Sequence, residues 1–423
     1  MPPQRATIIG LGVSGALLAL SLNRYSSTIP TIYELRPSPS TLGGAINLTP
    51  PVSRILASLG LLAAAKEIAF ETKEIDRHTS LRIERALLLE LLIRALDEVG
   101  VRVVFGKRLE GVREVDEGKV AAVFANGGEV ESELLFGCDG IHSLVRGAYV
   151  EPDRKATYSG LSSAYGFSAT PEGLIGKEGF EGTAVASGMR WSIIASYCGP
   201  RKEKVFVGAL MEVKAPDGDK DGWRGKGAMG AEAKKELVER FGGGDPVFKD
   251  VVEGVEEWSF FPGPPGGEGA ALAMEDAVVL GHLVGKVEEE GAEVEAVFRR
   301  YDELRRERQT MEFFMWAFLM VSWNKREWGF GYDAANVELG GPNILMRVYE
   351  FSEEIFQKKT NLRKMKLTIF IDLALAVMAP AVSAIECSGE CGPYPSTWQV
   401  WKCDSVCSGC VCRCGAGDKY ALC

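Results

Sequence analysis

The chain has 423 residues, a formal net charge of -10 and a hydrophobic fraction of 46%. This length accommodates two or three domains with ample cores, and the composition is typical of a soluble globular protein. The acidic balance and the sequence pI near 5.2 argue against a nucleic-acid partner. The N-terminus has no apolar segment of the kind that directs secretion.

The first 34 residues predict a strand, a turn, a helix and a second strand. A β-branched run at residues 7–9 is followed by Gly10-x-Gly12-x-x-Gly15 and an Ala/Leu-rich stretch. The first glycine permits the tight turn, the second lets a pyrophosphate approach the backbone, and the third lets the helix pack against the strand. Glu34 follows the second strand at the spacing needed to accept hydrogen bonds from a ribose. This stretch therefore predicts a dinucleotide site.

The next hundred residues predict further elements of the same domain. The glycine-rich segment 43–50 is expected to leave the sheet as a loop. Apolar periodicity predicts helices over 51–65 and 81–99, the second with Arg85 near its start. A strand is expected at 101–105, and a hairpin joins 120–124 to 130–135 through the turn 126–128.

A second strand–turn–helix pattern follows at residues 134–146. Asp139 stands where the strand ends, a position from which a carboxylate can meet a sugar or polyol hydroxyl. The alternative is that Asp139 only caps the following helix. We favour the first interpretation because this turn repeats the geometry of the first one.

Residues 155–260 change to alternating strands, at 165–167, 191–194 and 205–210, with a polar loop at 215–230 and a helix at 231–241. This pattern predicts a second, antiparallel domain. Glycine-rich residues 263–269 then run into another Ala-rich helix, which can aim backbone N–H groups at an anionic or carbonyl-bearing ligand.

Two later stretches have structural interpretations. Residues 294–312 predict a charged helix whose five arginines we interpret as a solvated face with ion pairs. The aromatic residues of 313–332 are interpreted as core or domain interface, although they could line a route for an apolar substrate.

Four motifs in a fixed order resemble those of the class A flavoprotein monooxygenases, in particular the fungal salicylate-hydroxylase-like FAD-dependent enzymes, over residues 5–312. They are the glycine turn with Glu34, Arg85 leading its helix, the segment 137–146, and residues 267–276. The resemblance implies an α/β fold: a Rossmann-like, GR2-type FAD-binding domain with an inserted antiparallel-sheet substrate domain. It implies FAD and NAD(P)H as cofactors, and O₂-dependent hydroxylation or epoxidation of an aromatic or polyketide-like small molecule.

The resemblance also assigns roles to residues. Glu34 would hold the adenosine ribose, Arg85 would lie near the pyrophosphate and ribityl chain, and Asp139 with Gly140 would serve both FAD and NAD(P)H. No catalytic base is identified, and the histidines at 78, 142 and 282 have neither metal-site nor triad spacing. The implied cofactor-binding positions are Gly10, Gly12, Gly15, Glu34, Arg36, Ala45, Arg85, Asp139, Gly140, Gly267, Gly269 and Ala270.

One departure from the family pattern is large. The family carries Gly-Asp-Ala at the end of a strand before the glycine loop, and its Asp holds the ribityl hydroxyls. This sequence has no Gly-Asp-Ala between residues 245 and 270, so a core strand of about five residues is expected to be missing. Either the gene model carries an internal deletion or flavin binding is weakened or absent. A catalytically inactive nucleotide-binding protein and an FAD-dependent reductase are therefore kept as alternatives.

The C-terminal part has a different character. Residues 365–384 contain Met, Lys, an apolar run and a small-x-small ending, the parts of a secretory signal peptide in order, and eight of the ten cysteines follow. We weigh two fused genes, one of them for a small secreted disulfide-rich protein, above a membrane anchor at 367–385 and above a buried helix with a cysteine metal site. The monooxygenase part is expected in the cytoplasm, with anchoring at the ER membrane as the alternative, and a genuine cysteine-rich tail would be secreted or luminal.

These patterns divide the chain into six segments. The first FAD-binding part spans 1–155, the substrate domain 156–258, and the second FAD-binding part with its helices 259–335. The others are a linker at 336–364, the signal-like or membrane segment 365–385, and the cysteine-rich tail 386–423.

Overall fold

A computed structural model describes most of residues 4–305 and five short strands beyond residue 384. The gaps within the first range are 41–42, 74–78, 116–117, 126, 153–160, 178–179, 189–190, 213–230, 242–245 and 263–268. The chain divides into two compact units, Met1–Ile344 and Leu345–Cys423.

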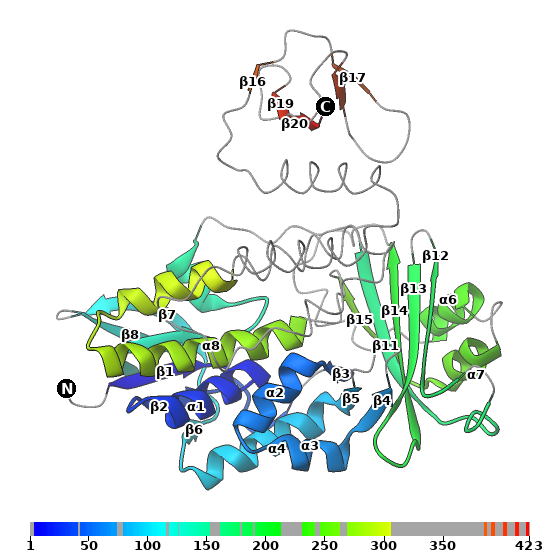
Figure 1. The fold of residues 1–423 in the computed structure, drawn as a ribbon, viewed down its shortest axis with the longest axis horizontal. Coiled ribbons are helices and arrows are strands. Elements are labelled where there is room, and N and C mark those ends of the chain that lie inside the picture. The colour runs from blue at the N-terminus through cyan, green and yellow to red at the C-terminus, as the bar shows by residue number, and fades with distance from the viewer. Residues whose placement is uncertain are drawn as a thin grey trace, which may run out of the picture. The chain divides into compact units, whose positions relative to one another are not determined.

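A parallel sheet organises the first unit (Figure 1). Its order is β10-β1-β2-β6, built from β1 (Arg5–Ile9), β2 (Ile29–Tyr33), β6 (Arg102–Val104) and β10 (Leu134–Gly137). All neighbouring strands are parallel. Because the carboxyl ends of parallel strands share one edge, the turns after β1 and β10 lie next to each other, as ligand-binding turns do in open α/β sheets.

Side chains of β1 alternate between two different cores. Ile8 packs among α1 (Val13–Tyr25), α4 (Arg85–Glu98) and α8 (Gly269–Glu290). Ile9 packs instead against the antiparallel meander β7 (Leu109–Val115), β8 (Lys119–Phe124) and β9 (Glu129–Ser132). The strand is therefore buried on both faces, as its unbroken β-branched run predicts.

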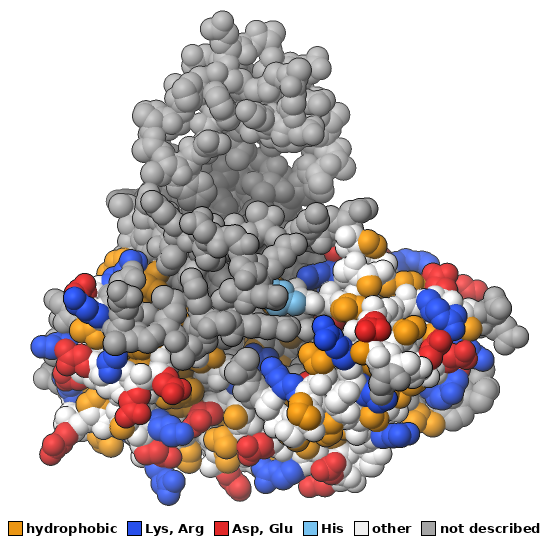
Figure 2. All heavy atoms as spheres, turned by 180° about the vertical axis from the view of Figure 1, so that it is seen from behind, with side chains coloured by type: hydrophobic (Ala, Val, Ile, Leu, Met, Phe, Trp, Pro, Cys, Tyr) orange, Lys and Arg blue, Asp and Glu red, His pale blue; other side chains and the backbone are white. Residues whose placement is uncertain are grey.

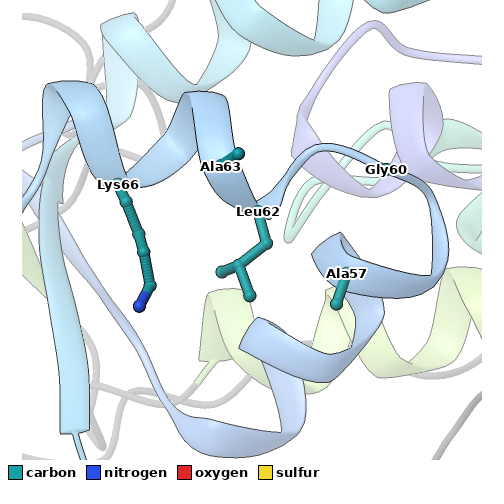
Figure 3. A pocket seen from close by; sticks show the side chains of 5 residues that line it. All are labelled: Ala57, Gly60, Leu62, Ala63 and Lys66. Atoms are coloured by element: carbon teal, nitrogen blue, oxygen red, sulfur yellow. The ribbon is translucent and has the colours of Figure 1, made fainter.

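A smaller antiparallel sheet, β3-β5-β4, carries the helices α2 and α3. The strands are β3 (Ala45–Leu48), β4 (Phe70–Lys73) and β5 (Thr79–Glu84); the helices are α2 (Pro50–Ser58) and α3 (Leu62–Ile68). A shallow hollow between the two helices is lined by Ala57, Gly60, Leu62, Ala63 and Lys66 (Figure 3). Among the described residues that line it, Lys66 supplies the one charged group.

Four expectations about element boundaries are corrected in this region. The helix expected over 51–65 is two helices, because Gly60 has a left-handed φ of +77° that ends α2. Residues 81–84 belong to β5, which pairs antiparallel with β3, so α4 begins only at Arg85. Residues 45–48 form a strand rather than a loop, and the strand expected at 130–135 is divided between β9 and β10.

The predicted antiparallel domain is a five-stranded sheet of order β12-β13-β14-β11-β15. Helices α6 (Ala231–Phe241) and α7 (Pro246–Gly254) supply Leu237, Val251 and Val252 to the core on one of its faces. The strands are β11 (Leu161–Ala169), β12 (Thr183–Gly188), β13 (Trp191–Cys198), β14 (Lys204–Glu212) and β15 (Ser259–Pro262). Because β15 pairs with β11, residues 259–262 extend this sheet beyond the boundary expected at 258.

The parallel sheet has four strands in the described part of the chain. β10 pairs with β1 on one side, and no described strand lies on its other side. Six residues separate the end of β15 at Pro262 from the start of α8 at Gly269. The strand that carries Gly-Asp-Ala in the family thus has no counterpart among the residues described.

The second unit contributes two small sheets, β16-β19-β20 and β17-β18. Its strands are β16 (Ile385–Glu386), β17 (Cys391–Pro393), β18 (Trp401–Cys403), β19 (Val411–Arg413) and β20 (Tyr420–Leu422). The aromatic stretch 313–332 and the signal-like residues 365–384 lie outside the described residues. Of the helices that are described, none is long and apolar enough to cross a membrane. On the first unit, basic and acidic side chains are interspersed over the face shown in Figure 2.

Candidate functional site

The turn after β1 uses its three glycines in three different ways. Gly10 has a φ of +104°, and a Cβ there would lie 2.5 Å from the Cys138 carbonyl oxygen of the neighbouring turn. A Cβ on Gly15 would lie 2.0 Å from the Gly10 oxygen, so α1 can approach the strand only without a side chain at this position. Gly12 instead faces open space, since no atom of the described residues lies within 4 Å of its Cβ position. Open space beside free N–H groups at a helix start suits a phosphate group.

Glu34 is held beside this turn by two backbone hydrogen bonds. The Leu11 N–H donates to Glu34 Oε2 at 2.7 Å, and the Arg36 N–H donates to Oε1 at 2.9 Å. The side chain is almost fully buried at the end of β2. Each carboxylate oxygen keeps further acceptor capacity, so a ribose hydroxyl could still donate to it.

Asp139 in the second turn is placed both to cap the following helix and to meet a ligand hydroxyl, the two roles considered from its sequence. Its Oδ2 accepts hydrogen bonds from the Leu144 N–H at 2.7 Å and the Val145 N–H at 3.3 Å, which caps the short helical segment leading to the π-helix η1 (Arg146–Val150). Its Oδ1 is buried and has no hydrogen-bond partner in the described part of the chain. A buried acceptor without a partner is costly, and a ligand hydroxyl would satisfy it. Gly140 follows with a φ of +85°.

Arg85 begins α4 and reaches back over the glycine segment before β3. Its N–H donates to the Gly44 carbonyl at 3.0 Å, and its Cδ lies 2.6 Å from the position of a Cβ on Gly43. Its buried Nε has no hydrogen-bond partner among the described residues. Burial lowers the pKa of Arg85; Tyr165 opposes this effect and the charge of Arg36 adds to it. A partly unpaired guanidinium near a second one suits an anion such as a pyrophosphate.

Two aromatic residues of the antiparallel sheet, Tyr165 and Phe206, lie against the Gly43–Gly44 segment beside Arg85. A Cβ on Gly44 would lie 2.5 Å from Phe206 Cε2 and 2.7 Å from Tyr165 Cδ2. Tyr165 also hydrogen bonds Ser259 of β15. Sequence reasoning identified the strands but not these two side chains, because alternation along a strand does not reveal which face meets another domain. Ala45 follows Gly44 and opens β3.

The remaining predicted positions lie at the start of α8. Gly269 and Ala270 form its first residues, and a Cβ on Gly269 would meet no atom within 4 Å in the part of the chain that is described. Gly267 lies outside the described residues. No group of three or more His, Cys, Asp and Glu side chains is placed to hold a metal ion in the part of the chain that is described.

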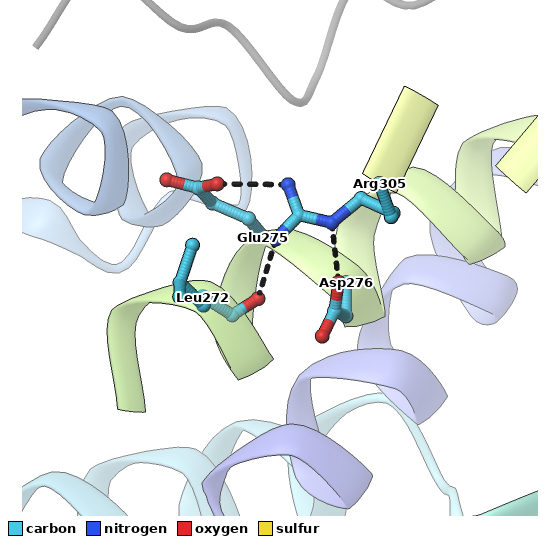
Figure 4. A network of polar contacts seen from close by, with 4 residues as sticks. All are labelled: Leu272, Glu275, Asp276 and Arg305. Carbon is cyan, nitrogen blue, oxygen red and sulfur yellow. Dashed lines mark hydrogen bonds and ion pairs between the residues drawn. The ribbon is translucent and has the colours of Figure 1, made fainter. Parts of the chain in front are cut away.

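The charged helix differs from its interpretation as a solvated face. Residues 295–305 are helical, and two of its arginines are buried, Arg300 with a relative exposure of 7% and Arg305 with 2%. Arg305 forms an ion pair with Glu275 and another with Asp276, both on α8 (Figure 4). The solvated-face interpretation is wrong for these two residues. Arg305 is buried against the carboxylates of Glu275 and Asp276, whereas the buried Arg300 forms its ion pair with Glu303 of the same helix. Arg306 and Arg308 lie outside the described residues.

The residues present fit the adenosine-pyrophosphate half of FAD. The open space at Gly12, the unpaired Arg85 Nε and the carboxylate of Glu34 supply room, an anion partner and a hydroxyl acceptor. For the flavin half, the described residues offer Asp139 Oδ1 and the start of α8. They offer no counterpart of the family's Gly-Asp-Ala carboxylate.

Comparison with known proteins finds relatives at low identity, and no family model matches the chain. It is 24% identical over 361 residues to a salicylate hydroxylase of Pseudomonas putida, covering 72% of this chain and 82% of that protein. It is 26% identical over 342 residues to the FAD-dependent monooxygenase pigN of Monascus ruber, covering 66% and 76% of the two chains.

Solved structures share the fold. The crystal structure of CtdE in complex with FAD and substrate 4 superposes with a TM-score of 0.63 at 14% identity, covering 85% of this chain and all of that one. The parallel sheet with its helices, the side meander and the antiparallel sheet therefore constitute the fold of the FAD-binding monooxygenases.

Proposed function

We propose that the chain is an FAD-dependent monooxygenase that uses NAD(P)H and O₂ to hydroxylate or epoxidise an aromatic or polyketide-like small molecule. The observation that carries the proposal is the close contact of the two strand-end turns at Gly10 and Cys138, together with Arg85 held against the Gly43–Gly44 segment beside an antiparallel sheet. The relatives' names support the class, since they include a salicylate hydroxylase and an FAD-dependent monooxygenase.

The residues have separate tasks in this proposal. FAD, when bound, supplies the redox chemistry that connects NAD(P)H oxidation to O₂ activation. Gly12 and Arg85 would hold the pyrophosphate, Glu34 the ribose, and Asp139 Oδ1 a hydroxyl of the ribityl chain. Tyr165 and Phe206 would close the corner where the antiparallel sheet meets the Gly43–Gly44 segment and would exclude water from it.

Activity assays test the proposal directly. The purified chain, supplied with FAD, should oxidise NADH or NADPH faster when a phenolic or polyketide-like compound is added. Oxygen from ¹⁸O₂ should appear in the product. Substrate reduction without oxygen incorporation would identify an FAD-dependent reductase instead.

A second candidate is a nucleotide-binding protein without catalytic activity. The missing Gly-Asp-Ala segment favours it, because the described residues provide fewer contacts for the flavin half than for the ADP half. Bound FAD with no NAD(P)H consumption, over a broad substrate panel, would support this candidate over the enzyme.

A further inference from the structure

Arg305 joins the helix 295–305 to the first turns of α8. Its Nη1 donates to Glu275 Oε2 at 2.9 Å and its Nη2 donates to the Leu272 carbonyl oxygen at 3.2 Å. Its Nε donates to Asp276 Oδ1. Figure 4 shows the guanidinium reaching all three groups at once. The side chains of Arg305 and Glu275 are 3% and 1% exposed, and that of Asp276 is 26% exposed, so the Arg305–Glu275 pair is buried and Asp276 lies at its edge.

The network places one positive charge against two carboxylates. Tyr301, on the same helix as Arg305, also hydrogen bonds Asp276. Burial raises the pKa of Asp276, and the Arg305 charge works against that rise. Removing one member of a buried charge network leaves the others uncompensated, which is strongly unfavourable. The geometry of α8 relative to the helix 295–305 is therefore fixed by specific bonds as well as by apolar packing.

The network also lies beside the second turn of the nucleotide site. The Cys138 thiol hydrogen bonds Ser14 of α1, and burial raises its pKa to about 12, with the charges of Asp139 and Asp276 acting in the same direction. Tyr301 interacts electrostatically with Cys138 as well. Phe298 of the helix 295–305 also packs against Phe136 of β10, with the ring centroids 6.5 Å apart. The helix that carries Arg305 therefore lies against the strand that leads into the Cys138–Asp139 turn.

We infer that Arg305 is a positioning residue for the flavin half of the cofactor site. It holds the start of α8, with Gly269 and Ala270, in place relative to the Cys138–Asp139 turn. The inference rests on the proposed function. The ADP half is assigned to Gly12, Glu34 and Arg85. Glu34 is held by the backbone of Leu11 and Arg36, whereas Arg305 bonds to α8, so ADP binding should not depend on Arg305.

Two conservative variants in the full chain separate positioning from folding. Arg305→Lys keeps the charge but cannot donate to Glu275, Asp276 and the Leu272 carbonyl together. Arg300→Lys is the matched control, since Arg300 is also buried but forms its ion pair with Glu303 within the same helix. For each protein, the Kd values of FAD and of ADP are measured by fluorescence titration, and the melting temperature is measured without ligand.

Arg305→Lys should weaken FAD binding by about threefold to tenfold while the Kd of ADP changes less than about twofold. Arg300→Lys should leave both Kd values unchanged. Equal FAD affinity in Arg305→Lys and the parent chain would overturn the inference and leave the proposed function intact, as would parallel losses of FAD and ADP affinity. If Arg305→Lys does not fold, the triple variant Glu275→Gln, Asp276→Asn, Arg305→Met removes the unbalanced charges and should show the same selective loss. Failure of the parent chain to bind FAD would overturn the proposed function itself.

Discussion

Gly12 and Gly15 belong to one turn but have opposite surroundings. A methyl group on Gly12 would enter open space, whereas one on Gly15 would collide with the Gly10 carbonyl oxygen 2.0 Å away. The two positions therefore separate ligand binding from folding. We assign the space at Gly12 to the pyrophosphate of FAD.

Gly12→Ala should weaken FAD binding by about tenfold or more, because the methyl group competes with the phosphates for space and N–H groups. Its free energy of unfolding without ligand should stay within about 1 kcal/mol of the parent value, whereas Gly15→Ala should lose about 1–3 kcal/mol through overpacking. Titration with FAD and urea unfolding measure the two effects. Equal FAD affinity in Gly12→Ala and the parent would show that the open space holds no ligand.

Asp276 gives the fold a dependence on pH. Burial raises its pKa, so the folded chain keeps this proton to a higher pH than the unfolded chain does. The stabilisation that comes from protonating Asp276 in the folded chain is therefore complete below the ordinary carboxyl pKa of about 4. It is lost as the pH rises through the raised pKa of the folded chain.

Asp276→Asn should consequently become more stable relative to the parent chain as the pH increases from 5 to 8. Urea unfolding at several pH values measures this difference, and Asp302→Asn, at an exposed position of the helix 295–305, is the control. A difference that stays constant or shrinks as the pH rises would contradict the account.

At the scale of elements, α1 and α8 approach each other through glycines. A Cβ on Gly285 would lie 1.9 Å from the Tyr25 carbonyl oxygen, and one on Gly281 would lie 2.4 Å from Ser21 Cβ. Both glycines are one helical turn apart on the same face of α8. This contact keeps α8 against the helix that begins at Gly12.

Gly285→Ala should lower the free energy of unfolding by about 1–3 kcal/mol, since backbone atoms must move to admit the methyl group. Gly147→Ala, whose added Cβ would meet no atom within 4 Å, should change stability much less. Thermal unfolding compares the two variants. Similar melting temperatures for both would show that the helices separate without cost.

Most elements of the first unit follow from local patterns in the sequence. The strand predicted from the β-branched run 7–9 is present as Arg5–Ile9, and the helix lies at 231–241 as predicted, because local preference and turn residues agree there. The prediction failed where tertiary pairing prevailed over local preference, as for residues 81–84, which pair with β3. At the site, the burial of Arg305 could not be predicted from the local sequence, because it depends on carboxylates 29 and 30 positions away.

At the scale of the whole molecule, the two units have different sequence character. The first carries the proposed FAD site, and the second contains the signal-like segment and eight of the ten cysteines. We expect two genes to have been joined, so a transcript read across codons 350–380 should show an interruption. A continuous message would favour a single protein with a cysteine-rich tail.

In the whole molecule, the two halves of FAD have unequal numbers of candidate contacts, because no Gly-Asp-Ala strand is found beside the four described strands of the parallel sheet. The ADP half has Gly12, Glu34 and Arg85, whereas the described residues lack the family's carboxylate for the flavin half. We therefore expect ADP to bind within about tenfold of FAD, a difference of about 1.4 kcal/mol. FAD that binds a thousandfold more tightly than ADP would mean that other residues secure the flavin.

The most direct test of the central claim is a titration of the purified chain with FAD, with ADP as competitor and Gly12→Ala in parallel. The account predicts saturable binding of one FAD per chain, full displacement by ADP, and a weakening of both ligands by about tenfold or more in the variant. Absence of saturable binding, or FAD binding that neither ADP nor Gly12→Ala affects, would contradict it.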